Sequence, residues 1–323
     1  MISHQLESKA LSLENNFLSI IIPTFNEEQY IAETLGAIFG GGLQCPFEVI
    51  VIDNGSTDKT IDIVSSFEVR LLSRPTGTIS ELRNYGVKEA KGSVFAFIDA
   101  DVTITKDWAY EVPQVVDELN NNSLLVTGAR YLPTNNTDWF NRYWYAPLTT
   151  YEASYINAGN MLVSRELYER IGGFSANLKT AEDYDFCNKA RLAGAEIVQN
   201  KKLAAIHMGY PLTVKGFIKR ERWHGREDFE TAQSYLDSKI AWVASSNLIL
   251  ILSCVLLLIT SGEFKYPVLY FFIIYLVMIA LSIRKFGVTG VGNLANTAII
   301  FYLYITGRTL ACVDRLLDAL KGK

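Results

Sequence analysis

The sequence has little that would place the protein outside the cell or on nucleic acid. Its four cysteines (Cys45, Cys187, Cys254 and Cys312) lie far apart and form no Cys-x-x-Cys or other metal-binding spacing, so we expect reduced thiols in or facing a reducing cytosol. Residues 1–16 are polar and contain no apolar run, so we expect no cleavable secretion signal. The net charge is −4, with no basic tail or cluster, so nucleic acid is not an expected partner.

Apolar residues are in excess instead, and the excess is concentrated after Trp242. Hydrophobic residues make up 49% of the chain. Residues 243–261 and 266–283 are uncharged stretches of about the length that crosses a bilayer. A third stretch, 292–313, is weaker because two asparagines and an arginine interrupt it, so we expect it to be interfacial or half-buried.

The positive residues near these stretches predict a topology for the membrane region. A basic region at 215–226 precedes the first stretch, and residues 284–285 (Arg-Lys) follow the second. Positive flanks mark the cytoplasmic side, so we expect a multi-pass protein of a bacterial or archaeal cell membrane whose part before Trp242 is cytoplasmic. A full third span would leave Arg315, Lys321 and Lys323 outside, which this rule disfavours.

Before the membrane region, short apolar runs alternate with helical segments. Runs at 17–22, 47–52, 69–72 and 93–98 read as buried strands with helices between them, which predicts an α/β fold with a parallel, doubly wound sheet.

Two further segments are of interest. Residues 135–155 are rich in aromatic side chains and read either as a packed lid or core helix or as an acceptor surface near lipid head groups. Residues 213–236 read as one charged helix.

The central strand, 93–98, ends in Asp99-Ala100-Asp101. Residues i and i+2 of an extended chain point to the same side, so both carboxylates leave the strand together, at the edge where open α/β sheets bind ligands. Asp53 ends another strand at that edge. Paired carboxylates there suit a divalent cation carrying substrate phosphates. The alternative is an acidic turn exposed to water.

Seven segments together resemble the successive signatures of glycosyltransferase family 2. They are residues 20–27 (IIIPTFNE), 51–58 (VIDNGSTD), 83–86 (RNYG), 97–101 (FIDAD), 159–163 (GNMLV), 171–174 (IGGF) and 182–185 (EDYD). They follow the family's order over about residues 17–230, which makes chance unattractive as an explanation. The resemblance implies the GT-A fold, a nucleotide-sugar donor and inversion of configuration.

The resemblance also implies roles on the donor side of the site. It implies that Pro23, Thr24, Asn26 and Glu27 bind the nucleotide. Asp53 is implied to contact the nucleobase, where its carboxylate can accept a hydrogen bond from an N–H group. Glu27 is equally explained as an acid in the first turn of a helix. Arg83 corresponds to the family's basic residue near the diphosphate; the alternative is a surface charge on a helix.

The remaining acids correspond to the metal and the catalytic base. We expect Asp101 to ligate Mg²⁺ or Mn²⁺, with Asp99 contacting the ribose or the water shell of the metal. His207 either completes the metal site or is an ordinary packed histidine. Asp183 corresponds to the catalytic base, and Glu182 orients it or binds the acceptor. Two acids at the start of a helix are also favoured by the helix dipole alone.

Residues 219–223 (KRERW) lie where processive relatives carry Gln-x-x-Arg-Trp, but this chain has no Gln there. That difference counts against a polymer-threading synthase. Arg222 and Trp223 are expected either to close over the nucleotide sugar, as the resemblance implies, or to belong to a basic helix lying against anionic lipid.

These observations favour a membrane-attached, metal-dependent, inverting glycosyltransferase. We expect an N-terminal extension (1–16), a GT-A catalytic domain (17–236) and a membrane region (237–323). The donor is a nucleotide sugar, with UDP the family's commonest nucleotide, and the acceptor a polyprenyl-diphosphate-linked saccharide in surface polysaccharide assembly. The alternatives are a polyprenyl-phosphate glycosyl synthase and, from another class, a catalytically silent nucleotide-sugar-binding membrane scaffold.

Overall fold

The computed structural model describes residues 16–135, 137–150, 154–178, 180–287 and 290–321. The N-terminal extension, Tyr151 and Lys323 therefore lie outside the described residues, apart from Asn16. The chain divides into two compact units, one made of Met1–Thr134 and Glu152–Tyr210, the other of Asn135–Tyr151 and Pro211–Lys323. The catalytic domain boundary expected at residue 236 stays a prediction.

The first unit is built on a seven-stranded sheet. In order across the sheet the strands are β3 (Arg70–Ser73), β2 (Phe47–Asp53), β1 (Leu18–Thr24), β4 (Val94–Ile98), β8 (Asn160–Ser164), β6 (Leu125–Gly128) and β9 (Glu196–Gln199). The first four are parallel, as expected, but β8 runs antiparallel to both β4 and β6. The expected α/β class is confirmed, with a mixed rather than a wholly parallel sheet.

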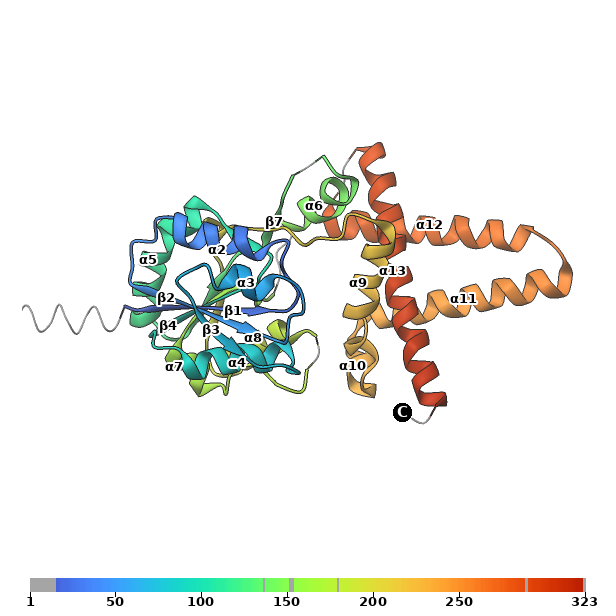
Figure 1. Cartoon of the computed structure of the whole chain (residues 1–323). Helices are drawn as coiled ribbons and strands as arrows, with labels where there is room; N and C mark the ends of the chain where they lie inside the picture. The colour runs from blue at the N-terminus through green and yellow to red at the C-terminus, as the bar shows by residue number, and fades with distance from the viewer. Residues whose placement is uncertain (1–15, 136, 151–153, 179, 288–289, 322–323) are drawn as a thin grey trace, which may run out of the picture. The chain divides into compact units, whose positions relative to one another are not determined.

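Helices cover both faces of this sheet, and the alternation of β1 shows why. Ile20 and Ile22 enter one buried cluster, shared with α2 (Ile31–Gly40) and α5 (Lys106–Asn121), whereas Ile21 enters the other. The second cluster is shared with α4 (Ile79–Glu89), α7 (Arg165–Arg170) and α8 (Glu182–Leu192). Figure 1 shows the two sets of helices on opposite sides of the sheet. The central strands are therefore buried on both faces, which explains their nearly unbroken apolar sequences.

The segment after β1 is a loop where the sequence predicted the start of a helix. α2 begins only at Ile31, because the preceding backbone is bound by the loop that follows β2. Asn26 has a left-handed backbone (φ 56°), and its N–H donates to Ser56 Oγ at 2.9 Å. The Glu27 N–H donates to Thr60 Oγ1 at 2.7 Å, in the first turn of α3 (Thr60–Val64). The loops after β1 and β2 thus form one joined surface.

A small second sheet brings His207 to the Asp-Ala-Asp segment. β10 (Ala205–His207) lies between β5 (Val102–Ile104) and β7 (Tyr131–Pro133). Since β10 is antiparallel to β5, His207 pairs with Val102, the residue directly after Asp101. The short helix η2 (Lys201–Leu203) precedes β10.

The second unit is helical. It contains η1 (Asn141–Tyr145), α6 (Ala146–Leu148), α9 (Val214–His224), η3 (Glu227–Phe229), α10 (Ala232–Asp237), α11 (Lys239–Ser261), α12 (Lys265–Phe286) and α13 (Val291–Leu320). The aromatic segment before Tyr151 belongs to this unit, with Phe140, Trp144 and Tyr145 buried, whereas Tyr155 packs in the first unit. The single helix expected over 213–236 is broken after α9, where Gly225 follows its last residue.

Two of these helices, α11 and α12, are long and apolar enough to cross a membrane by length and composition. Most of their large apolar side chains are exposed, including Leu252, Leu256 and Phe272. α13 contains the third hydrophobic stretch but extends well past it, and in Figure 1 it runs across the base of the α11–α12 hairpin. One face of α13 is buried, and its last turns carry exposed leucines beside Asp314, Arg315 and Asp318. The interfacial or half-buried placement expected of this stretch stays a prediction.

Candidate active site

The expected nucleotide-binding residues gather where β1 and β2 end. Pro23 and Thr24 are buried at the end of β1, and Thr24 pairs with Asp53 at the end of β2. The Asp53 carboxylate is 2% exposed and accepts from the N–H groups of Gly55 (2.8 Å) and Ser56 (3.0 Å). These bonds fix the turn after β2, and the acid therefore shapes the loop that would face a nucleotide.

Asn26 and Glu27 join that turn to the loop after β1. The Thr57 N–H donates to Asn26 Oδ1 at 2.8 Å. Burial, with Asp99 and Asp58 nearby, raises the pKa of Glu27 to about 7. The raised pKa of Glu27 indicates that this site holds more negative than positive side-chain charge.

Arg83, from α4, lies at the centre of the acidic residues. Its side chain is 1% exposed, and its two Nη atoms donate to Asp99 Oδ1 and to Glu182 Oε1, both at 2.7 Å. The guanidinium also lies over the Phe174 ring, 5.4 Å from its centroid. A buried arginine bridging two carboxylates fixes the end of β4 to the start of α8. Contact between Arg83 and a diphosphate stays a prediction.

Two further residues, Tyr131 and Gly159, fix the position of the Asp99 carboxylate. Tyr131 Oη donates to Asp99 Oδ2 at 3.3 Å, so both carboxylate oxygens have partners. Gly159 makes room for this carboxylate, because a Cβ built there would lie 2.0 Å from Asp99 Oδ2. The expectation that Asp99 contacts the metal stays a prediction, and its bonds show that its position is set by Arg83, Tyr131 and Gly159.

Asp101 and His207 face each other across the small sheet. His207 Nδ1 lies 3.6 Å from Asp101 Oδ2, and both side chains are largely buried. Gly209 leaves room for the Asp101 carboxylate, since a Cβ there would lie 2.0 Å from its Oδ2. Within the described ranges, no three His, Cys, Asp or Glu side chains are grouped closely enough to hold a metal ion. One carboxylate and one imidazole fit a Mn²⁺ or Mg²⁺ that takes its other ligands from substrate phosphates and water.

Glu182 and Asp183 begin α8, and the residue before them has a strained backbone. Ala181, directly before the two acids, has φ 57°, in the left-handed region that a side chain disfavours. Asn157 Nδ2 donates to Asp183 Oδ2 at 3.4 Å, and the Tyr184 N–H donates to Asp183 Oδ1 at 2.8 Å. Burial and the adjacent Glu182 raise the pKa of Asp183 to about 7, which suits a general base at neutral pH.

Arg222 and Trp223 belong to α9 in the second unit. Arg222 forms a two-bonded ion pair with Asp314 of α13, one of whose bonds joins Nε to Oδ2 at 2.7 Å. Trp223 is 45% exposed, and the Arg226 guanidinium lies 4.4 Å from a ring centroid of its indole. Both expected roles of these residues, over the nucleotide sugar or against lipid, stay predictions.

Several site residues gave no clear signal in the sequence. Tyr131, Asn157 and Gly209 act through contacts with residues far along the chain, which local sequence spacing does not reveal. Gly159 does the same, but it belongs to the 159–163 segment that the sequence already indicated. The glycines gave a weak signal, because a glycine inside a strand or directly after one often marks a close approach by another group.

A family model and several known proteins match this chain. The family model of glycosyl transferase family 2 matches residues 19–184, just over half of the chain. The poly(ribitol-phosphate) β-N-acetylglucosaminyltransferase TarS of Staphylococcus aureus is 33% identical over 115 residues, which is 33% of this chain and 20% of TarS. The dolichol-phosphate mannosyltransferase of Pyrococcus furiosus is 26% identical over 164 residues, 49% of this chain and 45% of that enzyme. The chain thus spans less than half the length of either relative.

A solved structure shares the fold over most of the chain. The mannosyltransferase PcManGT of Pyrobaculum calidifontis, in complex with GDP-Man and Mn²⁺, superposes with a TM-score of 0.59 at 19% identity. The match covers 92% of this chain and 87% of that one. At this identity the likeness is one of fold, and it agrees with the GT-A architecture expected from the sequence.

Proposed function

The chain belongs to glycosyl transferase family 2, and on that premise we propose that it transfers a sugar from a nucleotide sugar to a membrane-associated acceptor, with inversion at the anomeric carbon. The observation that carries the proposal is the set of acids at one sheet edge: Asp53, Asp99 and Asp101 after the parallel strands, and Asp183 at the start of α8. The silent-scaffold alternative is disfavoured, because a protein without catalysis need not keep both the expected metal-binding acids and the expected base.

On the donor side, the turn organised by Asp53 and Asn26 binds the nucleotide. Asp101 and His207 would hold a divalent cation, and Mg²⁺ or Mn²⁺ bound there would supply the positive charge that makes the diphosphate a better leaving group. Support for divalent metal use comes from the neighbouring fold crystallised with GDP-Man and Mn²⁺. Arg83 holds Asp99 in place by an ion pair, and the carboxylate that we assign to the metal, Asp101, is a different one.

On the acceptor side, Asp183 acts as the general base. The acceptor oxygen forms a bond to the anomeric carbon while the bond from that carbon to the diphosphate oxygen breaks. The hydroxyl proton passes to the Asp183 carboxylate, and the nucleoside diphosphate leaves. A single displacement inverts the configuration and needs no covalent sugar–enzyme intermediate. Asn157 and the Tyr184 N–H orient the carboxylate for this step.

The acceptor we propose is a polyprenyl-diphosphate-linked saccharide, as used in surface polysaccharide assembly, and the donor is UDP-linked. The apolar α11–α12 hairpin supports an acceptor that is held in a membrane. A polyprenyl-phosphate glycosyl synthase is the second candidate, because a dolichol-phosphate mannosyltransferase is among the similar proteins. The two differ in the attacking group: a sugar hydroxyl in the first case and a lipid phosphate oxygen in the second.

The test is release of nucleoside diphosphate by the detergent-purified full chain. A panel of nucleotide sugars is screened with Mn²⁺ or Mg²⁺, then with EDTA, in the presence of a membrane lipid extract. We expect release to require metal and lipid, and to fall by about 10³-fold in Asp183→Asn, a size typical of general-base loss. Asp183→Asn should still bind the nucleotide, whereas Asp101→Ala should lose metal-dependent nucleotide binding.

The acceptor is then identified from the lipid product. A sugar joined to a saccharide supports the first candidate, and a sugar joined directly to lipid phosphate supports the second. If no donor is consumed and nucleotide binding is indifferent to metal, the assignment of Asp101 is wrong and the scaffold explanation replaces the enzyme.

A further inference from the structure

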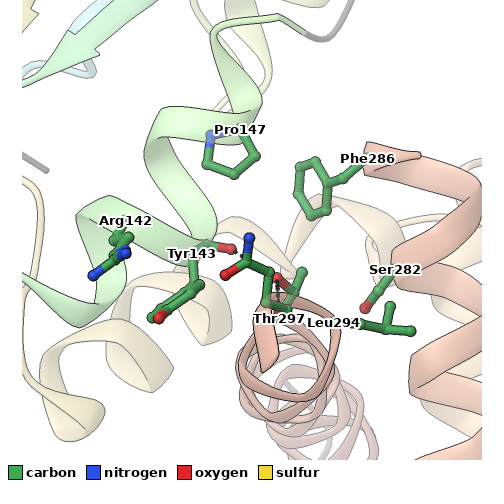
Figure 2. A pocket seen from close by; sticks show the side chains of 8 residues that line it. Arg142, Tyr143, Pro147, Ser282, Phe286, Leu294 and Thr297 are labelled. Carbon is green, nitrogen blue, oxygen red and sulfur yellow. Dashed lines mark hydrogen bonds between the residues drawn. The ribbon is translucent and has the colours of Figure 1, made fainter. Parts of the chain in front are cut away.

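A pocket of about 80 Å³ lies inside the helical unit, well separated in sequence from the acids of the first unit. It is bounded by η1 and α6, by the C-terminal end of α12 and by the first turns of α13. In Figure 2, Pro147 and Phe286 lie on one side of Thr297, whereas Arg142 lies at the edge beside Tyr143, with its guanidinium directed away from Phe286. The residues that line it are Arg142, Tyr143, Pro147, Ser282, Phe286, Asn293, Leu294 and Thr297.

The lining is amphiphilic, and its only charge is positive. Pro147, Phe286 and Leu294 supply apolar surface, Asn293 supplies an amide, and Arg142 supplies a guanidinium at the edge, 5.5 Å from the Tyr143 ring centroid. The Arg142 side chain is exposed and forms no ion pair with any residue that the structure describes. A pocket with an unneutralised guanidinium, an amide donor and an apolar wall fits a ligand with an anionic head and an apolar body.

The place of the pocket along α12 indicates what kind of ligand this is. α12 has 22 residues, which at about 1.5 Å each span roughly the thickness of a bilayer's hydrocarbon core. Ser282 and Phe286 lie in its last turns, beside Arg284 and Lys285. If α12 crosses the membrane, the pocket lies at the depth of the lipid head groups, where basic and aromatic residues collect.

The walls of the pocket are held together by contacts between the elements. The Lys285 Nζ lies 4.8 Å from the Trp144 ring centroid, 5.7 Å from Phe301 and 5.6 Å from Tyr304, which ties the end of α12 to η1 and α13. Trp139 Nε1 donates to Asn296 Oδ1 at 2.8 Å, a second bond between the aromatic segment and α13. The pocket is thus formed by the fold itself, which lowers the cost of ordering a ligand in it.

We propose that this pocket binds the head group of an anionic membrane lipid, with Arg142 and Asn293 contacting its phosphate and the acyl chains lying along the exposed apolar face of α12. The inference rests on the membrane attachment in the proposed function, but not on the transfer reaction. It gives the aromatic segment a role at the lipid surface as well as in packing.

The experiment measures lipid binding by the full chain without any sugar nucleotide. Detergent-purified protein is titrated with phosphatidylglycerol or phosphatidylcholine, and bound lipid is counted by native mass spectrometry. We expect phosphatidylglycerol to bind more tightly, and Arg142→Gln to weaken it about tenfold, the size of a lost charge-assisted contact. The matched control is Arg170→Gln, an exposed arginine at the end of α7.

A second pair of variants separates the pocket from general attraction between charges. Asn293→Phe fills the pocket and keeps Arg142, so it should also weaken phosphatidylglycerol binding. Val291→Phe is the control, because Val291 is 87% exposed on the same helix and does not line the pocket.

Three results would overturn the proposal: equal binding of both lipids, an Arg142→Gln variant that behaves like Arg170→Gln, or an Asn293→Phe variant that binds normally. Competition by millimolar inorganic phosphate alone would mean a site for free phosphate instead of a lipid. Failure of the transferase is a separate outcome, since it would leave lipid binding intact and abolish only nucleoside-diphosphate release.

Discussion

At the scale of single residues, the site is organised by the balance of charge around Arg83. One buried guanidinium serves Asp99 and Glu182, while Glu27 and Asp183 have raised pKa values near it. The site therefore holds more carboxylates than cations. An excess of this kind is costly in the free protein and is relieved when a divalent cation or a proton arrives. In the reaction that we propose, the divalent cation arrives with the nucleotide sugar, and the proton comes from the hydroxyl group of the acceptor.

The protonation of Asp183 gives a pH dependence with a definite sign. Its pKa is raised to about 7, and only the ionised carboxylate can accept the acceptor's proton. Below pH 7 we expect kcat/KM for the donor to fall about tenfold per pH unit, and above it to level off. The profile is measured by nucleoside-diphosphate release in buffers of constant ionic strength. A flat profile between pH 5 and 8 would contradict the assignment of Asp183 as the base.

Gly159 provides a test of how tightly Asp99 is placed. A methyl group at this position would lie 2.0 Å from Asp99 Oδ2, so Gly159→Ala forces the carboxylate out of its seat between Arg83 and Tyr131. We expect nucleotide affinity to fall by tenfold or more, as measured by calorimetry with Mn²⁺ present.

The matched control is Gly36→Ala. Gly36 lies on α2 with no atom within 4 Å of a built Cβ, and alanine favours helix. This control should bind nucleotide as the unaltered chain does and should be slightly more stable. Equal binding by Gly159→Ala and Gly36→Ala would show that the position of Asp99 does not matter for the nucleotide.

At the scale of elements, α9 and α13 are locked by a buried ion network. Arg308 of α13 donates to Glu221 of α9 at 3.1 Å and to Asp228 of η3 at 3.0 Å. Gly307 allows the helices to approach, because a Cβ there would lie 2.6 Å from Glu221 Cβ. The acid inside KRERW, at one of the two variable positions of the Gln-x-x-Arg-Trp pattern, is therefore a structural anchor of α9.

Removal of that acid should weaken the helical unit. The Glu221 side chain is 4% exposed, so Glu221→Gln leaves the Arg308 charge buried with only Asp228 as its partner. We expect a loss of about 3 kcal/mol and a lower Tm in detergent, followed by tryptophan fluorescence. Glu230→Gln, at an exposed acid nearby, is the control and should leave Tm unchanged. An unchanged Tm in both variants would mean that the network adds nothing to stability.

The sequence predicted the elements well wherever one local pattern was sufficient. The buried strands at 47–52 and 93–98 and the two long apolar helices were found at their observed places, since burial on both faces gives unbroken apolar runs. The loop at 25–30 was missed because its backbone bonds go to Ser56 and Thr60, thirty residues away. The antiparallel direction of β8 and the position of the Asp99 carboxylate also depend on contacts between distant segments. Such contacts leave no periodic pattern in the local sequence.

At the scale of the whole molecule, the chain joins a nucleotide-sugar fold to a helical unit with an exposed apolar hairpin. The aromatic segment 135–150 belongs by its contacts to the helical unit, although it is inserted between β7 and β8 of the first unit. The two units are therefore linked by more than one passage of the chain. Such an arrangement suits the transfer that we propose, from a soluble donor to an acceptor held in a membrane.

The hairpin gives the last prediction, the topology of the chain in a membrane. The turn between α11 and α12 contains Glu263, whose side chain is half-exposed, and Tyr110 on α5 is 85% exposed in the first unit. With the four native cysteines replaced by alanine, Glu263→Cys should react with a membrane-impermeant maleimide in intact cells, because positive flanks keep the other ends of both helices inside. Tyr110→Cys should react only after the cells are made permeable. If both sites react in intact cells, the first unit is extracellular. If neither reacts, the hairpin does not cross the membrane and its apolar face is covered in another way.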